Sequence, residues 1–250
     1  MGVSVDDVTN AEAVGIIARW VAEVRVGSPP RQVVTTNPEF VMTARRSPAF
    51  RALLNAAALS TPDGQGLIWA SRLLPTHRLR QRAPGVEMVE MLAAYAAQSG
   101  ARIFLLGATP GVAEDAARIL AARYPGFAPA GCYAGSPDPA EDEALCRKVM
   151  DSGADILLVA YGAPKQDFWI QRNIAAGRLR SPLAVAIGVG GAFDFISGRA
   201  IRAPRLMRRL GLEWLHRLYK EPWRYRRILN VIYFGLLVAR DALKLRLRRN

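Results

Sequence analysis

The residue with the clearest chemical potential is Asp63, which stands in the segment Ser60-Thr61-Pro62-Asp63-Gly64-Gln65-Gly66. An apolar stretch precedes this segment and a helical pattern follows it, so Asp63 is expected in a loop between a strand and a helix. A carboxylate held beside a hydroxyl group can accept its proton while the oxygen attacks an electrophile. Asp-Gly is also a common turn pair, so a turn or helix cap is the structural alternative for Asp63.

Two further polar clusters lie between a predicted strand and a predicted helix. In Thr35-Thr36-Asn37-Pro38, Asn37 could contact a ligand or cap the following helix, a role that asparagine fills readily. Arg82 opens the loop Arg82-Ala83-Pro84-Gly85, just before a helical pattern. A guanidinium group and a helix N-terminus both favour phosphate oxygens. Arg82 is therefore a candidate for an oxyanion site, with a solvated loop arginine as the alternative.

Glycine-bearing segments mark three more strand ends. The segment Leu106-Gly107-Ala108-Thr109-Pro110-Gly111 lacks the full dinucleotide fingerprint GxGxxG, which argues against NAD. Lys165 and Gln166 begin a predicted helix, where they could donate hydrogen bonds to phosphate or sugar hydroxyls. The glycines of Gly188-Val189-Gly190-Gly191, shortly before Asp194, indicate either a ligand close to the backbone or a tight crossover.

The elements that must position these residues alternate along the chain. The predicted strands are Gln32 to Thr36, Ala57 to Ser60, Arg102 to Gly107, Phe127 to Cys132, Ile156 to Tyr161 and Leu183 to Gly188. The predicted helices are Ala11 to Val24, Gly66 to Leu73, Val86 to Gln98, Val112 to Arg123, Glu141 to Met150 and Lys165 to Ile174. This alternation predicts an α/β fold with Rossmann-like layers and a mostly parallel sheet, which binds ligands at the carboxyl ends of its strands.

Positive charge is concentrated at the carboxyl end of the chain. Residues 199–250 hold 15 of the 34 lysines and arginines but only three acidic residues, Glu213, Glu221 and Asp241. Charge segregated in this way informs about partners rather than about fold. We therefore divide the chain into an α/β body, residues 1–200, and a basic, amphipathic, helical appendage, residues 201–250.

The appendage contains an apolar run, Ile228 to Ala239, with basic residues on both sides. The run is too short to span a bilayer, for which about 20 apolar residues are needed. Its pattern favours a helix on an anionic membrane surface, where each Lys or Arg contributes on the order of 1 kcal/mol. A core helix with solvated arginines is the alternative. Nucleic acid is not expected as a partner, because no nucleic-acid-binding motif accompanies the charge.

Two features indicate the compartment. Cys132 and Cys146 have neither metal-ligand nor disulfide-framework spacing, which favours reducing conditions. Residues 1–10 are polar and acidic and show no signal-peptide pattern. Both features predict a cytoplasmic protein.

The motifs follow one another in a characteristic order. They are Thr35-x-Asn37, Asp63-Gly64, Arg82-x-x-Gly85, Pro164-Lys165-Gln166-Asp167, Gly190-Gly191-x-Phe193-Asp194 and a tail run from Gly211-Leu212-Glu213-Trp214 to Arg227. In this order they resemble the WecG/TagA/CpsF glycosyltransferases over about Val33 to Arg227. The resemblance implies a bacterial enzyme that transfers N-acetylmannosamine or a related sugar from a UDP donor to a polyprenyl diphosphate-linked saccharide in cell-surface polysaccharide synthesis. It also implies inversion at the anomeric centre, no metal, and a peripheral position on the inner face of the cell membrane.

The resemblance also implies roles for individual residues. Asp63 would be the catalytic base, and Asp194 would contact the nucleotide. The pocket for donor and acceptor would be lined by Thr35, Asn37, Arg82 and Gln166. The appendage would close over the site and touch the membrane or the lipid diphosphate through Arg217, Arg224 and Arg227.

No cofactor and no metal site are predicted. The chain has no Asp-x-Asp pair, through which metal-dependent sugar transferases usually hold the donor diphosphate. Arg82, Lys165 and the tail arginines remain to stabilise the charge that grows on the diphosphate. A basic membrane- or nucleic-acid-binding module without catalysis and a Rossmann oxidoreductase are the alternatives from other classes. A homo-oligomer is left open.

Overall fold

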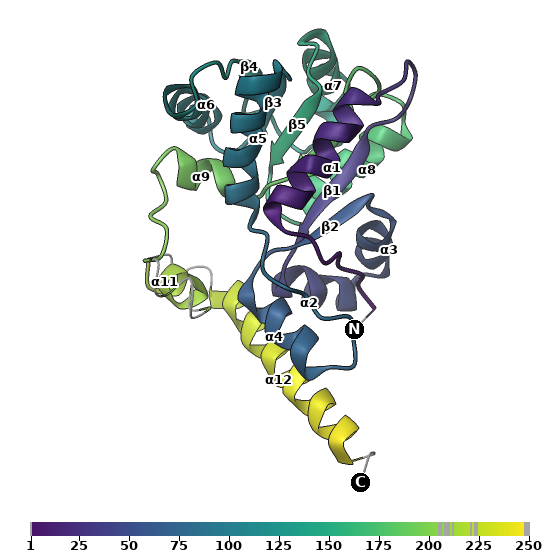
Figure 1. Ribbon diagram of the computed structural model, residues 1–250, viewed down its shortest axis with the longest axis vertical. Helices are drawn as coiled ribbons and strands as arrows, with labels where there is room; N and C mark the ends of the chain where they lie inside the picture. Colours follow the sequence, from purple (N-terminus) through teal and green to yellow (C-terminus); the bar gives the residue numbers. More distant parts are fainter. Residues whose placement is uncertain are drawn as a thin grey trace.

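Parallel strands form one six-stranded sheet at the centre of the protein (Figure 1). The computed structural model describes residues 2–204, 207, 211, 213–220, 222 and 225–247, with the backbone alone for residues 217, 226–228 and 246. The strands are β1 (Arg31–Thr36), β2 (Leu59–Pro62), β3 (Ile103–Gly107), β4 (Pro129–Tyr133), β5 (Ile156–Ala160) and β6 (Val185–Gly188). Their spatial order is β2-β1-β6-β5-β3-β4. The predicted α/β fold with a parallel sheet is confirmed.

The central strands are apolar along their length because helices cover both faces of the sheet. β3 and β5 are buried at every position, and such continuous apolar runs are typical of parallel strands between two helical layers. β2 begins at Leu59 rather than at the predicted Ala57, and its pairing with β1 continues to Pro62. Asp63 therefore follows directly on the last residue of β2.

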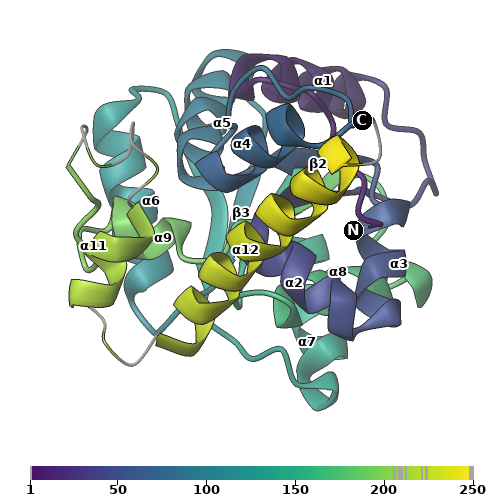
Figure 2. The same ribbon diagram turned by 90° about the horizontal axis from the view of Figure 1, so that it is seen from below.

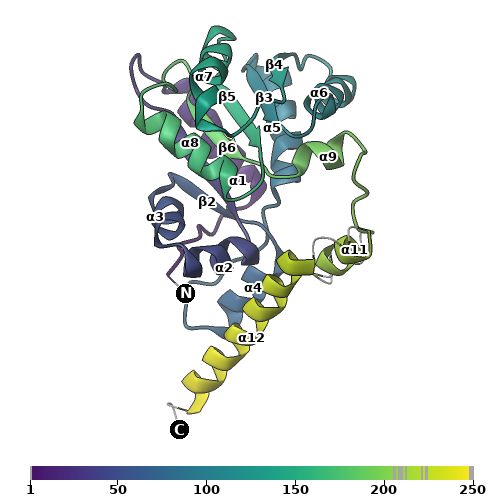
Figure 3. The same cartoon turned by 180° about the vertical axis from the view of Figure 1, so that it is seen from behind.

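Two helical layers enclose the sheet. One face packs against α1 (Asn10–Ala22), α5 (Gly85–Ser99), α6 (Val112–Arg123) and the short α9 (Ala192–Ile196). The other face packs against α7 (Asp142–Asp151), which follows the short turn η1 (Pro139–Glu141), and α8 (Lys165–Ala175) (Figure 3). The helices α2 (Pro38–Arg46) and α3 (Pro48–Ala56) lie beside α8. The ring centroid of Phe50 in α3 is 5.6 Å from that of Phe40 in α2 and 5.7 Å from that of Phe168 in α8. The loop after β2 leads directly into α4 (Gln65–Leu73).

The appendage contains α11 (Glu213–Lys220) and the long α12 (Tyr225–Leu247). Figure 2 shows α12 running across α2 and α4. Phe234, Leu237 and Val238 are buried there, in one cluster with the side chains of Val41, Met42, Leu67 and Ile68 from α2 and α4. The helix is longer than the apolar run of the sequence because its charged ends continue the same helix. One face of the tail therefore packs on the body.

Gly66 allows these three helices to approach closely. A Cβ atom on Gly66 would lie 2.9 Å from Cγ of Pro38 in α2 and 3.7 Å from Cε1 of Phe234 in α12. The first of these distances is shorter than carbon atoms tolerate, so a side chain at position 66 would push α4 away from α2. The first turn of α4, which follows Asp63, is thus in contact with both α2 and α12.

A second face of α12 is apolar and exposed. Its side chains are Leu229, Ile232, Tyr233, Leu236, Leu243 and Leu247, which are 45–70% exposed. They recur at intervals of three, four and seven residues, which places them on one stripe of the helix. Within the described part of the chain, no helix combines the length and the apolar character that crossing a membrane requires.

Candidate active site

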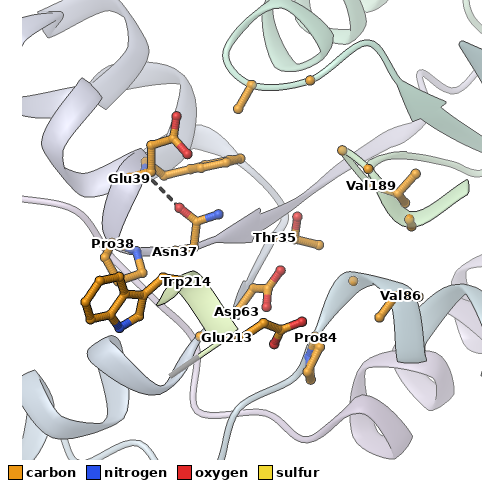
Figure 4. A pocket seen from close by; sticks show the side chains of 18 of the residues that line it. Thr35, Asn37, Pro38, Glu39, Asp63, Pro84, Val86, Val189, Glu213 and Trp214 are labelled. Carbon is orange, nitrogen blue, oxygen red and sulfur yellow. Dashed lines mark hydrogen bonds between the residues drawn. The ribbon is translucent and has the colours of Figure 1, made fainter. Parts of the chain in front are cut away.

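A cleft of about 470 Å³ opens at the carboxyl ends of β1, β2, β5 and β6 (Figure 4). Parallel α/β sheets commonly bind their ligands at this edge. Six residues that the sequence singles out line the cleft: Thr35, Asn37, Asp63, Arg82, Gln166 and Asp194. Glu213 and Trp214 from the first turn of α11 line it as well, so the appendage contributes to its wall.

Asp63 is held by backbone contacts on both sides. Its N–H donates to the Thr36 carbonyl oxygen at 2.7 Å, and the neighbouring Pro62 carbonyl accepts from the N–H of Ala83 at 2.6 Å. Gly64 then turns the chain into α4 with φ +114°, a value that favours glycine. The carboxylate thus sits on a loop tied to β1 and to the Arg82 loop, and it points into the cleft (Figure 4).

Thr35 and Asn37 make local bonds as well as lining the cleft. The Thr35 hydroxyl donates to the Gly188 carbonyl at 3.0 Å and so joins the ends of β1 and β6. The Asn37 side-chain oxygen accepts from the N–H of Phe40 at 3.0 Å, which makes it the N-cap of α2. The structural alternative for Asn37 is therefore realised. Its amide nitrogen remains on the cleft side, so capping and ligand contact are compatible (Figure 4).

Gln166 connects two glycine loops. Its side chain is 1% exposed, and its carbonyl oxygen accepts from the N–H of Gly162 at 3.1 Å and from that of Gly190 at 3.0 Å. Both glycines have positive φ values, which turn their N–H groups toward Gln166. Gln166 was expected to contact the substrate, but its side-chain oxygen instead holds together the loops after β5 and β6. The neighbouring Lys165 is exposed and is not among the residues that line the cleft.

Arg82 lies in an alternating series of charges at the mouth of the cleft. Its Nη1 atom is 3.6 Å from Oε2 of Glu213, whose Oε1 atom is 3.7 Å from Nε of Arg202. Nη2 of Arg202 in turn donates to Oε1 of Glu87 at 2.8 Å. Sequence reasoning missed Glu213 and Arg202 as site residues, because they come from the distant segment after α9.

Comparison with known proteins identifies the family. The model of the glycosyl transferase WecG/TagA/CpsF family matches residues 1–248, almost the whole chain. The chain belongs to this family. Family membership decides for a glycosyltransferase over the oxidoreductase and the noncatalytic binding module, and it confirms the resemblance seen in the motifs.

Three relatives illustrate how far the similarity extends. Each is named an N-acetylglucosaminyldiphosphoundecaprenol N-acetyl-beta-D-mannosaminyltransferase. The protein of Bacillus subtilis (strain 168) is 34% identical over 210 residues, 84% of this chain and 79% of its own. That of Bacillus spizizenii (strain ATCC 23059 / NRRL B-14472 / W23) is 35% identical over 199 residues, 80% and 75% respectively. That of Staphylococcus aureus (strain MW2) is 32% identical over 250 residues, 98% and 93%.

Not every residue predicted for this WecG/TagA/CpsF glycosyltransferase can be placed. Asp194 lies on α9 at the edge of the cleft, and its backbone carbonyl accepts from the Ala200 N–H and the Ser197 hydroxyl. Arg217 and Arg227 belong to α11 and α12, but their side chains lie outside the described residues, as does the whole of Arg224. Among the described residues, no three His, Cys, Asp or Glu side chains are grouped as metal ligands.

Asp167 is a buried carboxyl group to which the sequence analysis assigned no role. Its side chain is fully buried beside Gln166, and neither carboxyl oxygen has a hydrogen-bond partner among the described residues. Burial raises the pKa of Asp167 to about 7. The motif Pro164-Lys165-Gln166-Asp167 is the sequence feature that could have drawn attention to Asp167. No pattern in the sequence indicates that the carboxyl group at the end of this motif is buried away from water.

Replacing Asp167 with asparagine is expected to stabilise the enzyme at pH 8. Between pH 3.8 and about 7 the unfolded chain releases the proton of Asp167 while the folded chain retains it, so wild-type stability falls as the pH rises. Above that window the cost stays constant, at up to about 4 kcal/mol. Urea unfolding of both proteins should therefore give curves that coincide near pH 4 and separate toward pH 8.

The matched control is the exposed Asp151 at the end of α7. Asp151→Asn should change the free energy of unfolding little, because this side chain is exposed. A stability difference for Asp167→Asn that does not vary between pH 4 and 8 would contradict a protonated, buried carboxyl group.

Proposed function

We propose that this glycosyltransferase moves N-acetylmannosamine or a related sugar from a UDP donor to a polyprenyl diphosphate-linked saccharide in cell-surface polysaccharide synthesis. The transfer inverts the anomeric centre and needs no metal ion. The names of the relatives support the sugar and the acceptor, because all three name the same transferase activity. The observation that carries the proposal is the presence of Asp63 and Arg82 in one cleft.

Asp63 and Arg82 supply the two functions that an inverting displacement requires. Asp63 accepts the proton of the acceptor hydroxyl while its oxygen forms a bond to the anomeric carbon of the donor. The bond between that carbon and the UDP oxygen breaks on the opposite side, and the electron pair leaves with UDP. Arg82, a cation already positioned in the cleft wall, stabilises the negative charge that grows on the diphosphate.

The proposal of metal independence rests on the kinds of residue that line the cleft. The sequence contains no Asp-x-Asp pair, and Asp63 is followed by Gly64 rather than by a second carboxylate within two residues. An arginine carries its charge at every physiological pH and offers a planar fork of donors that matches phosphate oxygens. Such a group can therefore take the part that a divalent ion takes in other transferases.

We assign the exposed face of α12 to contact with the anionic inner surface of the cell membrane. Leucine, isoleucine and tyrosine side chains supply the apolar area, and the basic residues around them, such as Arg240 and Lys244, supply attraction to acidic headgroups. The lipid-linked acceptor lies in the same membrane. Because the opposite face of α12 packs on the body, this contact would bring the cleft close to that acceptor.

The decisive experiment combines the full-length enzyme with UDP-N-acetylmannosamine and an N-acetylglucosaminyl diphosphate carrying a short polyprenyl chain. We expect a product heavier by one N-acetylhexosamine, and chelation with EDTA should change the rate by less than about twofold. Other UDP-sugars in parallel reactions identify the preferred donor. Strict dependence on added manganese would refute metal independence, and absence of product with every UDP-sugar would refute the proposed reaction.

A further inference from the structure

Four side chains of alternating charge link the body of the enzyme to the appendage. The order is Arg82, Glu213, Arg202 and Glu87, with closest distances of 3.6, 3.7 and 2.8 Å between successive partners. Arg82 and Glu87 belong to the loop before α5 and to its first turn, whereas Glu213 begins α11. Arg202 lies at the start of the appendage, in the segment between α9 and α11. The series thus joins segments that are more than a hundred residues apart in the chain.

The two contacts of Glu213 are looser than the contact of Arg202 with Glu87. Charge-assisted hydrogen bonds usually span about 2.7–2.9 Å, the range in which the Arg202–Glu87 pair falls. Glu213 stands farther from both of its arginines and uses a different carboxyl oxygen for each. The side chains of Glu213, Arg82 and Arg202 are only 22–28% exposed, so water screens the interaction of Glu213 with the two arginines only in part. Arg202 is therefore held in place by Glu87, whereas Glu213 is shared between Arg82 and Arg202.

Arg82 has a second potential partner in the proposed reaction. Both Arg82 and Glu213 line the cleft, and the proposed substrate carries a diphosphate that Arg82 would stabilise. Two anions that bind the same guanidinium compete with one another, and the like charges of diphosphate and Glu213 repel. Glu213 can give up Arg82 without being left unpaired, because Arg202 already contacts its other oxygen.

We propose that Glu213 occupies the place of the substrate diphosphate on Arg82, and that Arg202 takes over Glu213 when the diphosphate binds. Glu213 and Arg202 are then positioning residues that act through Arg82. Because Glu213 is the first residue of α11, the exchange also couples diphosphate binding to the position of the appendage. This inference rests on the proposed function, and it concerns the same cleft.

The test measures the Kd of UDP for the full-length enzyme in EDTA-containing buffer by calorimetric titration. Glu213→Gln removes the competing anion and should tighten UDP binding by about three- to tenfold. Arg202→Gln removes the residue that receives Glu213 and should weaken binding by a similar factor. The double variant should bind like Glu213→Gln, because Arg202, although it still contacts Glu87, no longer has a Glu213 carboxylate to receive. Arg202→Lys, which keeps the charge, should restore most of the affinity.

The double variant distinguishes this mechanism from direct binding. If Arg202 itself held the diphosphate, the double variant would bind as weakly as Arg202→Gln, and the proposal would be overturned. The controls are Glu143→Gln and Arg147→Gln, which break an exposed ion pair within α7 and should leave the Kd unchanged. Thermal melting of each variant verifies that it is folded.

The outcomes separate this inference from the proposed function. If wild-type enzyme binds UDP and Glu213→Gln fails to tighten the binding, the exchange is refuted while the transferase proposal stands. If wild-type enzyme does not bind UDP at all, both are refuted. Glu213→Gln decides the question even if Arg202→Gln does not fold.

Discussion

Exchange of Asp63 for asparagine is expected to reduce turnover by about 10²–10⁴ while the protein remains folded. Asparagine has nearly the same shape as aspartate, so the backbone bond from residue 63 to Thr36 and the turn at Gly64 can persist. The amide cannot accept a proton at neutral pH, so the acceptor hydroxyl loses its base. The measurement is the steady-state rate with saturating donor and acceptor.

Two further measurements show whether the loss comes from the chemical step. The Kd of UDP and the melting temperature should stay close to the wild-type values, because Asp63 is assigned to the acceptor hydroxyl rather than to the diphosphate. Asp151→Asn, on the exposed end of α7, should retain the wild-type rate. A wild-type rate for Asp63→Asn would remove Asp63 from the mechanism.

Replacing two leucines on the exposed face of α12 should abolish most membrane binding. Leu229 and Leu236 are 56% and 63% exposed, so glutamine at both positions removes apolar area without disturbing the body. Each leucine buried in lipid contributes about 1.5 kcal/mol or more, so the double variant should bind vesicles of anionic phospholipid about 100-fold more weakly. Sedimentation with vesicles measures this directly.

A leucine on the body-packed face provides the contrast. Leu237 is 3% exposed and lies between α2 and α4, so Leu237→Ala should lower the free energy of unfolding by about 2–5 kcal/mol. Unchanged vesicle binding by Leu229→Gln with Leu236→Gln would show that this face has another partner. Deletion of the whole appendage is a poorer test, because it also uncovers Val41, Met42, Leu67 and Ile68.

The sheet was predictable because each strand carries its own signal. β5 reads Ile-Leu-Leu-Val-Ala, a short and continuously apolar run that is typical of a buried parallel strand. The five-residue helix α9 was not predicted, because Ala192–Ile196 is too short to show helical periodicity and follows glycines that read as a loop. α12 extends beyond the apolar run Ile228 to Ala239. The exposed Arg240 and Lys244 follow this run within the same helix, so charge ends the apolar run without ending the helix.

The site was predictable where chemistry and strand ends coincide. Thr35 lies near the end of β1, and Asn37 and Asp63 directly follow β1 and β2. Parallel pairing brings such strand ends to one edge of the sheet. Glu213 and Arg202 could not be assigned to the site, because the contacts of Glu213 with Arg82 and Arg202 depend on how the appendage folds back over the body. The burial of Asp167 likewise depends on the packing of α8 against the sheet, which no local pattern reveals.

Under the proposed contact of α12 with the membrane, the bare backbone at Gly66 has a mechanical implication. α4 touches Pro38 and Phe234 through this residue, only three positions after Asp63. A tilt of α12 imposed by lipid packing would therefore reach the loop that holds the carboxylate through rigid helices alone. The rate of sugar transfer should then respond to the curvature and tension of the surrounding lipid, even when donor and acceptor concentrations are constant.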